Sequence, residues 1–281
     1  MQVFKTHKKL NEALKGSGIS LGMVPTMGAL HEGHLALIRQ ALKENDRVVV
    51  SIFVNPTQFN DAEDLKNYPR NLDDDLAQLE PLGAALYIYT PKPQDLYAEG
   101  VVAQPQQLMG LDLVMEGAFR QHHFDGVATV VEKLLRSVNP DRAYFGEKDF
   151  QQLQIIRCLV EQQKIPVQII GCPIVRAADG LALSSRNLLL NPEQKSAAPF
   201  LYQILQDVQH QWPPKKLSDL TKWVDQQFKE QALFSLDYFV IAEEENLQSA
   251  QSLEKGKKYR SFIAAKLGGI RLIDNMGLPI I

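Results

Sequence analysis

The sequence has little cysteine and no long apolar run. Its 281 residues include only Cys158 and Cys172, whose spacing suggests neither a zinc site nor a disulfide framework. The strongest apolar run, residues 48–54, is far too short to span a bilayer, and the first residues lack the apolar core of a signal peptide. We therefore expect a soluble cytoplasmic protein that does not act at a membrane.

The chain also lacks a strong excess of charge of either sign. Its formal net charge of −3 argues against a protein that binds nucleic acid, because nucleic-acid phosphates usually require a basic surface. A local basic pocket for one small polyanion remains compatible with this charge. Hydrophobic residues make up 45% of the sequence, enough for a sizeable core, and the length is typical of about two domains.

Strands and helices are expected to alternate over the first two thirds of the chain. Apolar residues recur at helical spacing between Leu35 and Leu42, whereas residues 47–54 are continuous and β-branched, as in a buried parallel strand. We expect strands at 21–25, 47–54, 84–89, 142–145 and 167–172, and further helices at 72–82, 127–137 and 151–163. This succession predicts an α/β fold with a doubly wound, Rossmann-like parallel sheet and right-handed crossovers.

The pattern changes after Asp179-Gly180. Helices are expected at 192–209 and 217–232, separated by a Trp-Pro-Pro break, and strands at 236–242, 259–267 and 271–273. We therefore predict two domains: a Rossmann-like domain of residues 1–176 and a second, smaller α+β domain of residues 177–281.

The segment from Met23 to His34 carries the strongest chemical signal. It is expected to form a strand, a glycine-bearing turn and then the beginning of a helix that carries His31 and His34. Glycine lets a ligand approach the backbone, and the first turn of a helix has free N–H groups and the positive end of the macrodipole. Such a terminus attracts phosphate, so the segment predicts nucleotide chemistry.

Three more polar clusters follow predicted strands or loops. They are residues 55–59, 146–152 and 183–187. In open α/β sheets, ligands collect at the carboxyl ends of the strands, near the point where the strand order reverses. The four clusters together therefore predict one ligand-binding cleft.

These segments resemble a known family. The His-x-Gly-His turn and the later Ser-Ser-Arg loop resemble the two signatures of the nucleotidyltransferase superfamily that includes class I aminoacyl-tRNA synthetases. More narrowly, the chain resembles the pantothenate synthetase (pantoate–β-alanine ligase) family from end to end. The motifs that carry this resemblance are residues 25–34, 53–59, 68–70 with 73–75, 145–149, 184–187 and 271–275.

The resemblance implies an ATP-dependent ligase. Pantoate would attack the α-phosphorus of ATP to give pantoyl adenylate and pyrophosphate, and the amine of β-alanine would then form pantothenate and release AMP. The implied cofactor is Mg²⁺, and a homodimer built through the first domain is implied as well. The first step brings a carboxylate against a triphosphate, so the chemistry requires positive charge and precise positioning rather than a protein nucleophile.

The resemblance also implies roles for individual residues. His34 is expected to stabilise phosphoryl charge with help from His31, while Lys148 and Arg186 contact phosphate oxygens. Gln58 is expected to bind pantoate and β-alanine, Gln152 to bind pantoate, and Asp74 to contact Mg²⁺. The full set expected to bind ATP is Met27, Gly28, Ala29, Leu30, His31, Glu32, Gly33, His34, Gly146, Glu147, Lys148, Asp149, Val175, Leu183, Ser184, Ser185 and Arg186.

Each motif taken alone has a simpler explanation, such as capping histidines or acidic residues that compensate a helix dipole. Three other functions stay open: another adenylate-forming enzyme on the same scaffold, a metallohydrolase using His31, His34 and Asp74, and a nucleotide-binding regulator without catalysis. The HExxH pattern of zinc proteases is missing, which counts against the hydrolase. The roles of His122 and His123 are not assigned.

Overall fold

The computed structural model describes residues 1–16, 18–60 and 62–281, and these divide into two compact units. Unit 1 consists of Met1–Glu147 and Gln151–Pro173, and unit 2 of Lys148–Phe150 and Ile174–Ile281. The three residues 148–150 therefore belong to a different unit from the residues on either side of them. The boundary that we place between residues 176 and 177 stays a prediction.

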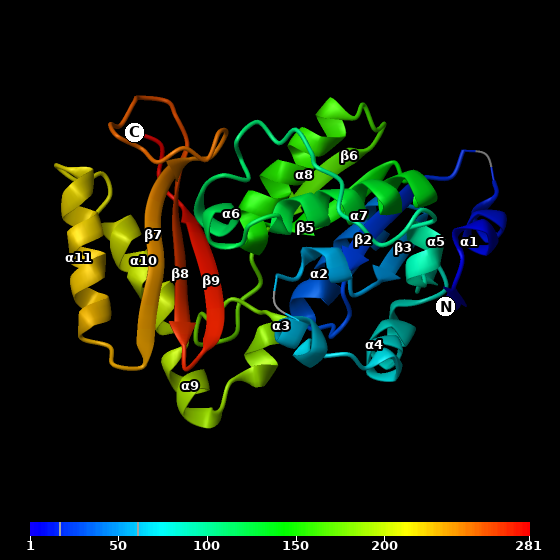
Figure 1. Cartoon of the computed structure of the whole chain (residues 1–281), viewed down its shortest axis with the longest axis horizontal. Helices are drawn as coiled ribbons and strands as arrows, with labels where there is room; N and C mark the ends of the chain where they lie inside the picture. Colours follow the sequence, from blue (N-terminus) through cyan, green and yellow to red (C-terminus); the bar gives the residue numbers. More distant parts are fainter. Residues whose placement is uncertain (17, 61) are drawn as a thin grey trace. The chain divides into compact units, whose positions relative to one another are not determined.

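Unit 1 contains a six-stranded parallel sheet with the order β1-β4-β3-β2-β5-β6 (Figure 1). The predicted doubly wound parallel sheet is thereby confirmed. The strands are β1 (Gln2–Phe4), β2 (Leu21–Thr26), β3 (Arg47–Ile52), β4 (Leu86–Tyr89), β5 (Arg142–Gly146) and β6 (Gln168–Cys172).

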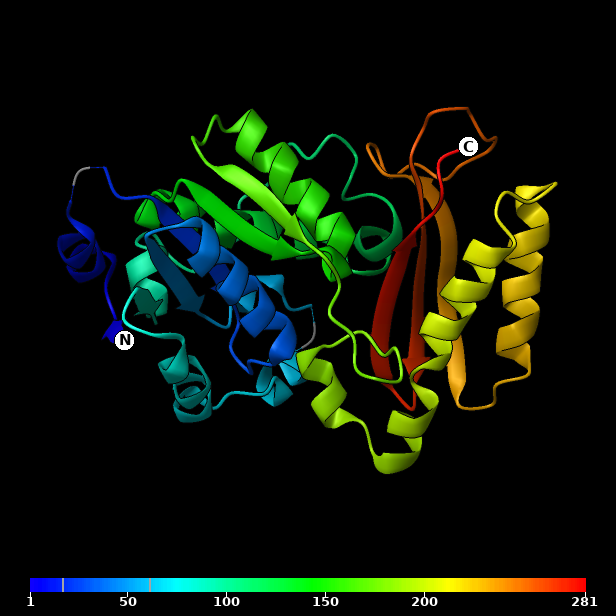
Figure 2. The same ribbon diagram turned by 180° about the vertical axis from the view of Figure 1, so that it is seen from behind.

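Helices cover both faces of this sheet. α7 and α8 lie on the face seen in Figure 1, and α2 lies on the face seen in Figure 2. Val24, Val50 and Ile38 are fully buried between α2 and the sheet, which is why these positions are apolar. The helical elements are α1 (His7–Leu14), α2 (Glu32–Glu44), η1 (Pro56–Gln58), α3 (Ala62–Asn67), α4 (Leu72–Leu79), η2 (Glu80–Leu82), α5 (Pro93–Leu96), α6 (Met115–Phe119), α7 (His123–Val138), η3 (Glu147–Asp149, which runs into unit 2) and α8 (Phe150–Gln162).

Strand β2 marks the point where the strand order reverses. It pairs with β3 on one side and with β5 on the other, in parallel. The first three polar clusters of the sequence follow these three neighbouring strands. Because the carboxyl ends of parallel strands share one edge, the fold brings the beginnings of these clusters to the usual ligand-binding edge of a doubly wound sheet.

Unit 2 is the smaller α+β unit that the sequence predicts. Its three antiparallel strands have the order β7-β8-β9, and α10 and α11 lie on one face of them (Figure 2). Leu205, Val224 and Ile263 are fully buried in its core. The elements are β7 (Phe234–Glu243), β8 (Tyr259–Leu267), β9 (Ile270–Gly277), η4 (Ser185–Leu189), α9 (Pro192–Ala197), α10 (Phe200–His210) and α11 (Leu217–Lys229).

Several local predictions need correction. The helix expected at 72–82 ends at Leu79, and residues 80–82 form the short helix η2. The single helix expected at 192–209 is two helices, because Pro199 lacks a backbone N–H and its ring hinders continuation of the helix through residue 198. Strand β1 and helix α1 at the start of the chain are not among the elements predicted from the sequence. The hydroxyl of Thr6 caps α1 by accepting from the backbone N–H of Lys9, a signal that could have predicted this helix.

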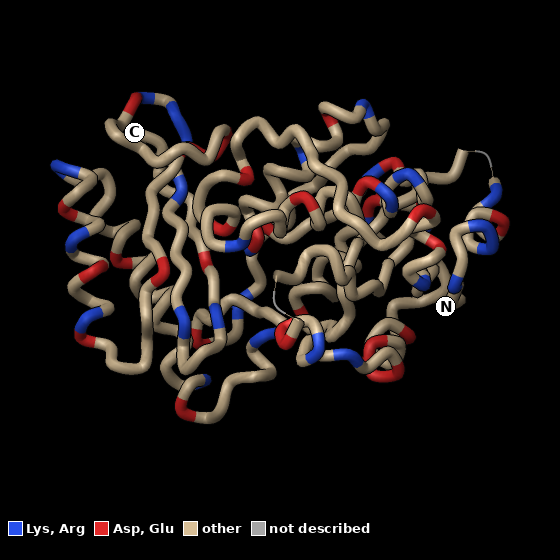
Figure 3. Tube along the Cα trace, viewed as in Figure 1, with Lys and Arg blue, Asp and Glu red and all other residues tan. Residues whose placement is uncertain are grey.

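Charged residues of both signs are interspersed along the chain (Figure 3). Within the described ranges, no helix combines the length and the apolar character required to cross a membrane.

Gly126 of α7 provides a test of how closely this helix packs against η1. A Cβ atom at this position would lie 2.3 Å from the carbonyl oxygen of Thr57 and 2.8 Å from the Cα of Gln58. Gly126→Ala should therefore lower the free energy of unfolding by about 1–3 kcal/mol, as expected for overpacking against rigid backbone. Thermal unfolding measures the effect. Gly277→Ala is the control, because its added Cβ would meet Arg260 Nη2 at an ordinary 3.6 Å; equal melting temperatures for the two variants would contradict the packing.

Candidate functional site

The turn that follows β2 has an unusual backbone. Gly28 and Ala29 both adopt positive φ angles, of 77° and 49°. A side chain at residue 28 is excluded by space as well, since its Cβ would lie 2.8 Å from Asp75 Oδ2. The Thr26 hydroxyl accepts from the N–H of Gly28 at 3.2 Å and donates to the carbonyl of Ser51 on β3 at 2.8 Å. The turn is thereby fixed to the edge of the sheet.

His31 and His34 form a reciprocal cap at the beginning of α2. His31 Nδ1 accepts from the N–H of Gly33 at 3.1 Å, and His34 Nδ1 accepts from the N–H of His31 at 3.4 Å. An imidazole nitrogen that accepts a hydrogen bond cannot carry the proton, so in both neutral rings the proton lies on Nε2. The two rings also pack together, with centroids 4.0 Å apart. The cap therefore defines two adjacent Nε2–H donors at a helix N-terminus.

Asp75, rather than the neighbouring Asp74, holds this turn. Its two carboxylate oxygens accept from the backbone N–H groups of Ala29 at 3.1 Å and Leu30 at 2.7 Å, and only 2% of the residue is exposed. Burial raises the pKa of Asp75 above its ordinary value, while the two N–H donors act in the opposite direction. No individual role is predicted for Asp75 from the sequence, because the Asp-Asp-Asp run indicates the beginning of a helix but not which carboxylate faces the turn.

Gln58 is buried in η1 with its amide held at both ends. The oxygen accepts from Asn55 Nδ2 at 3.2 Å, and the amide nitrogen donates to Met27 Sδ at 2.9 Å. Asn55 is itself held, because its oxygen accepts from the Tyr97 hydroxyl at 2.6 Å. The structure thus brings two residues of the predicted site, Met27 and Gln58, into contact.

His123, which the sequence leaves unassigned, supports the same segment. It is 6% exposed, and its Nδ1 lies 2.7 Å from the carbonyl oxygen of Gln58. His122 is exposed and pairs with Asp125 on its own helix. His123 therefore positions the backbone that carries Gln58.

Unit 2 carries the other group of predicted site residues. The Lys148 ammonium lies 3.4 Å from Asp149 Oδ1, and its side chain is 18% exposed. Residues 175–183 form a hairpin in which Leu183 donates to the carbonyl of Val175 at 3.0 Å. Ser184 then caps η4 by accepting from the N–H of Arg186 at 3.3 Å. Val175, Leu183, Ser184 and Arg186 therefore belong to one continuous local structure.

The remaining predicted residues lie in unit 1. Gly146 is the last residue of β5, Glu147 follows it as the first residue of η3, and Gln152 is half-buried in the first turn of α8. Asp74 is exposed in the first turn of α4, where its carboxylate accepts from the side chain of Asn71. In the described part of the chain, no group of three or more histidines, cysteines, aspartates or glutamates has the arrangement to hold a metal ion.

A doubly wound sheet with a capped histidine turn at its switch point is typical of nucleotide-binding α/β proteins. The sequence model of the pantoate-beta-alanine ligase family matches residues 2–277. A pantothenate synthetase of Christiangramia forsetii is 50% identical over 281 residues, which cover 99% of each chain. The chain belongs to the pantoate–β-alanine ligase family, as the sequence motifs predict.

Solved structures agree with this assignment. Pantothenate synthetase from Thermus thermophilus superposes with a TM-score of 0.91 at 40% identity, covering 99% of this chain and 100% of that one. A pantoate-beta-alanine ligase from Francisella tularensis, complexed with beta-gamma ATP and beta-alanine, has a TM-score of 0.81 at 36% identity and covers 99% and 97%. The likeness therefore extends over both units.

Asp75→Asn tests whether the Asp75 carboxylate holds the turn through its hydrogen bonds with Ala29 and Leu30. The amide offers one oxygen in place of two and directs an N–H group at a backbone donor, so one buried N–H loses its acceptor. We expect a loss of about 1–3 kcal/mol in the free energy of unfolding, measured by chemical denaturation. Asp73→Asn, at an exposed position of the same helix turn, should be nearly neutral; equal losses in both variants would contradict the role given to Asp75.

Proposed function

We propose that this protein condenses pantoate with β-alanine at the expense of ATP. The pantoate carboxylate attacks the α-phosphorus, forming a new P–O bond as pyrophosphate leaves. The β-alanine amine then attacks the acyl carbon of pantoyl adenylate, a C–N bond forms, and AMP leaves with the electrons of the broken C–O bond. The amine loses a proton in this second step.

One observation carries this proposal: the family match extends over residues 2–277 and so includes all the sequence motifs at once. The solved relative complexed with beta-gamma ATP and beta-alanine is 36% identical and supports both of these substrates. A metallohydrolase would bind its metal through ring nitrogens that carry no proton. In His31 and His34 the unprotonated nitrogen is Nδ1, which already accepts a backbone hydrogen bond, and the proton lies on Nε2. This arrangement counts against a metallohydrolase. Pantoate as the acid is inferred from the family.

The β2–α2 turn is proposed to bind the phosphates of ATP. Both histidine rings accept at Nδ1, so their Nε2–H groups can donate to phosphate oxygens. The positive end of the α2 dipole acts in the same direction. Donors fixed before the reaction stabilise developing charge without reorganisation, so His34, assisted by His31, is the first candidate for a catalytic residue.

Lys148, Ser184, Ser185 and Arg186 are proposed to contact the same nucleotide. Lys148 supplies a compact positive charge, and Arg186 a planar guanidinium suited to phosphate oxygens. The cap that Ser184 forms on η4 supports this role, because it fixes the backbone that carries Arg186. Val175 and Leu183, joined across the hairpin, are proposed to contact the adenine side of ATP.

Gln58 and Gln152 are proposed to bind pantoate, with Gln58 also meeting β-alanine. An amide can bind hydroxyl and carboxylate groups without adding a charge to a site that already receives a triphosphate. The hydrogen bonds that join the Gln58 amide to Asn55 and Met27 support this role, because they orient the amide before substrate binds.

Mg²⁺ and a homodimer are also part of the proposal. The exposed carboxylate of Asp74 suits Mg²⁺, a hard ion that keeps several waters and binds few protein carboxylates when phosphates share it. Bound Mg²⁺ would neutralise phosphate charge. The homodimer is inferred from the family resemblance alone. The cytoplasmic location stays a prediction from the sequence.

The decisive assay supplies ATP, Mg²⁺, pantoate and β-alanine and measures AMP and pantothenate together, which should form in equal amounts. His34→Ala should lower kcat by about 100-fold or more, as loss of a preorganised donor does, while the protein still folds and loses only the roughly 0.5–2 kcal/mol of a helix cap. His210→Ala, at an exposed position in unit 2, is the matched control. AMP formation that does not depend on pantoate would refute pantoate as the substrate. A normal rate in His34→Ala would refute the catalytic role of His34.

Asp74→Asn tests the metal contact separately. The Mg²⁺ concentration for half-maximal activity should rise by roughly tenfold, while the maximal rate at saturating Mg²⁺ recovers largely. Titration of activity with MgCl₂ at fixed ATP measures this shift, and Asp73→Asn serves as control. An unchanged Mg²⁺ dependence would remove Asp74 from the metal site.

A further inference from the structure

The Arg-Leu-Ile-Asp-Asn motif of residues 271–275 has no part in the roles described above, although it helps to identify the family. It lies in β9, and two adjacent members, Asp274 and Asn275, are 4% and 2% exposed. A buried carboxylate and a buried amide are costly unless they are paired. Their partners therefore indicate what the motif does.

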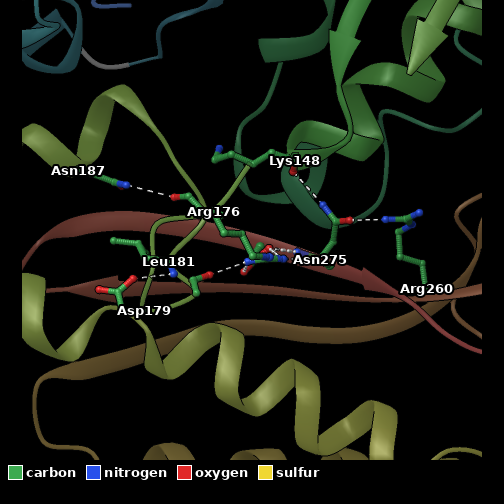
Figure 4. A network of polar contacts seen from close by, with 10 residues as sticks. Lys148, Arg176, Asp179, Leu181, Asn187, Arg260 and Asn275 are labelled. Carbon is green, nitrogen blue, oxygen red and sulfur yellow. Dashed lines mark hydrogen bonds and ion pairs between the residues drawn. The ribbon is translucent and has the colours of Figure 1, made fainter. Parts of the chain in front are cut away.

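Asn275 holds the backbone of Lys148. Its Nδ2 donates to the carbonyl oxygen of Lys148 at 2.8 Å, and its Oδ1 accepts from Arg260 Nη1 at 2.6 Å (Figure 4). The orientation of the amide is unambiguous, because guanidinium only donates and a carbonyl only accepts. Asn275 thus joins β8 and β9 to a segment more than a hundred residues earlier in the sequence.

A second contact holds the other end of that segment. The guanidinium carbon of Arg260 lies 3.9 Å from the ring centroid of Phe150, and this ring lies 6.0 Å from that of Phe262. Residues 148–150 therefore belong to unit 2, although Glu147 and Gln151 on either side belong to unit 1. The position of the Lys148 backbone is set by the antiparallel sheet of unit 2.

Asp274 holds the hairpin of residues 175–183. Its carboxylate accepts two hydrogen bonds from Arg176, at 2.6 and 2.9 Å, and Arg176 donates in turn to the carbonyl of Gly180 at 3.0 Å. The same guanidinium stacks over the ring of Tyr202, 4.1 Å from its centroid. Two adjacent residues of one strand thus hold the segment of Lys148 and the hairpin that leads to Ser184–Arg186.

We propose that Asn275 is a positioning residue for Lys148 in the first half-reaction. Its amide fixes the position of the Lys148 backbone relative to the hairpin of residues 175–183, which Asp274 holds through Arg176. The ammonium and the Ser184–Arg186 loop then keep a constant relation to each other. This proposal rests on the proposed function, because it needs Lys148 to contact the phosphates.

Lys148 needs a positioning residue because its side chain is flexible. It carries a point charge on four methylenes, so the region that the ammonium can reach is set by the position of the Cα atom. A misplacement of about 1 Å can cost roughly 100-fold in rate when catalysis depends on positioning. A neutral amide achieves the placement without adding a further negative charge near the ammonium, which already lies 3.4 Å from Asp149 Oδ1.

The test is a double-mutant cycle on pyrophosphate release in a single turnover with ATP, Mg²⁺ and pantoate. Asn275→Ala should slow this step by about 10- to 100-fold. In a Lys148→Ala background the same substitution should change the rate by less than about twofold, because two residues that act as one unit are not additive. Asn275→Asp, which keeps an acceptor for Arg260 but loses the donor to Lys148, should behave like Asn275→Ala.

Ser261→Ala is the matched control for stability. Ser261 is fully buried in β8, and its hydroxyl donates to the carbonyl of Met276 on β9 at 3.2 Å, so its loss weakens the same sheet without touching Lys148. It should leave pyrophosphate release nearly normal.

The outcomes separate the two proposals. A normal rate in Lys148→Ala refutes the phosphate role of Lys148 and with it the inference. Two outcomes refute only the positioning role, provided that Lys148→Ala releases pyrophosphate slowly. In the first, Asn275→Ala releases pyrophosphate at the normal rate. In the second, Asn275→Ala lowers the rate by the same factor with and without Lys148. Failure of both Asn275 variants to fold, judged by circular dichroism, would likewise assign Asn275 a purely structural function.

Discussion

The pair of hydrogen bonds from the N–H groups of Ala29 and Leu30 to the buried carboxylate of Asp75 is the interaction on which the unit 1 site depends. These bonds hold a turn with two consecutive left-handed residues, which would otherwise be strained. Because the turn is held, the chain enters α2 with His31 at its N-cap. The reciprocal cap of the two imidazoles, and therefore the direction of their N–H groups, follows from this geometry.

Unit 2 achieves a similar result with different groups. There, one carboxylate and one amide on β9 hold two loops through Arg176 and the Lys148 carbonyl. Burial raises the pKa of Asp274, while the guanidinium of Arg176 and the ammonium of Lys148 oppose that shift. In both units a buried carboxylate or amide therefore fixes the backbone of a segment that carries predicted site residues.

Much of this fold could be predicted from the sequence because its signals are local. A buried parallel strand such as β3 is a β-branched run, and the His-x-Gly-His turn is contiguous, so both are evident in the linear sequence. Edge strand β1 has only three residues, too few for such a pattern. The break between α9 and α10 was also local, and Pro199 could have indicated it.

The remaining features depend on tertiary contacts. Asp74 and Asp75 are adjacent and chemically identical, and only the rotation of α4 decides that Asp75 is buried under the turn. The attachment of residues 148–150 to unit 2 depends on β8 and β9, which follow more than a hundred residues later. Similarly, His123 acquires its role only when α7 packs against η1.

The tautomers of His31 and His34 provide the most direct measurement of the central claim, that a braced turn presents two Nε2–H groups. Long-range ¹H–¹⁵N correlation spectra of histidine-labelled protein distinguish the two ring nitrogens, and single-residue variants assign the signals of the six histidines. We predict that both neutral rings carry the proton on Nε2 and that ATP shifts these Nε2 signals. A proton on Nδ1 of either neutral ring in the free protein would contradict the cap and the phosphate-binding role derived from it.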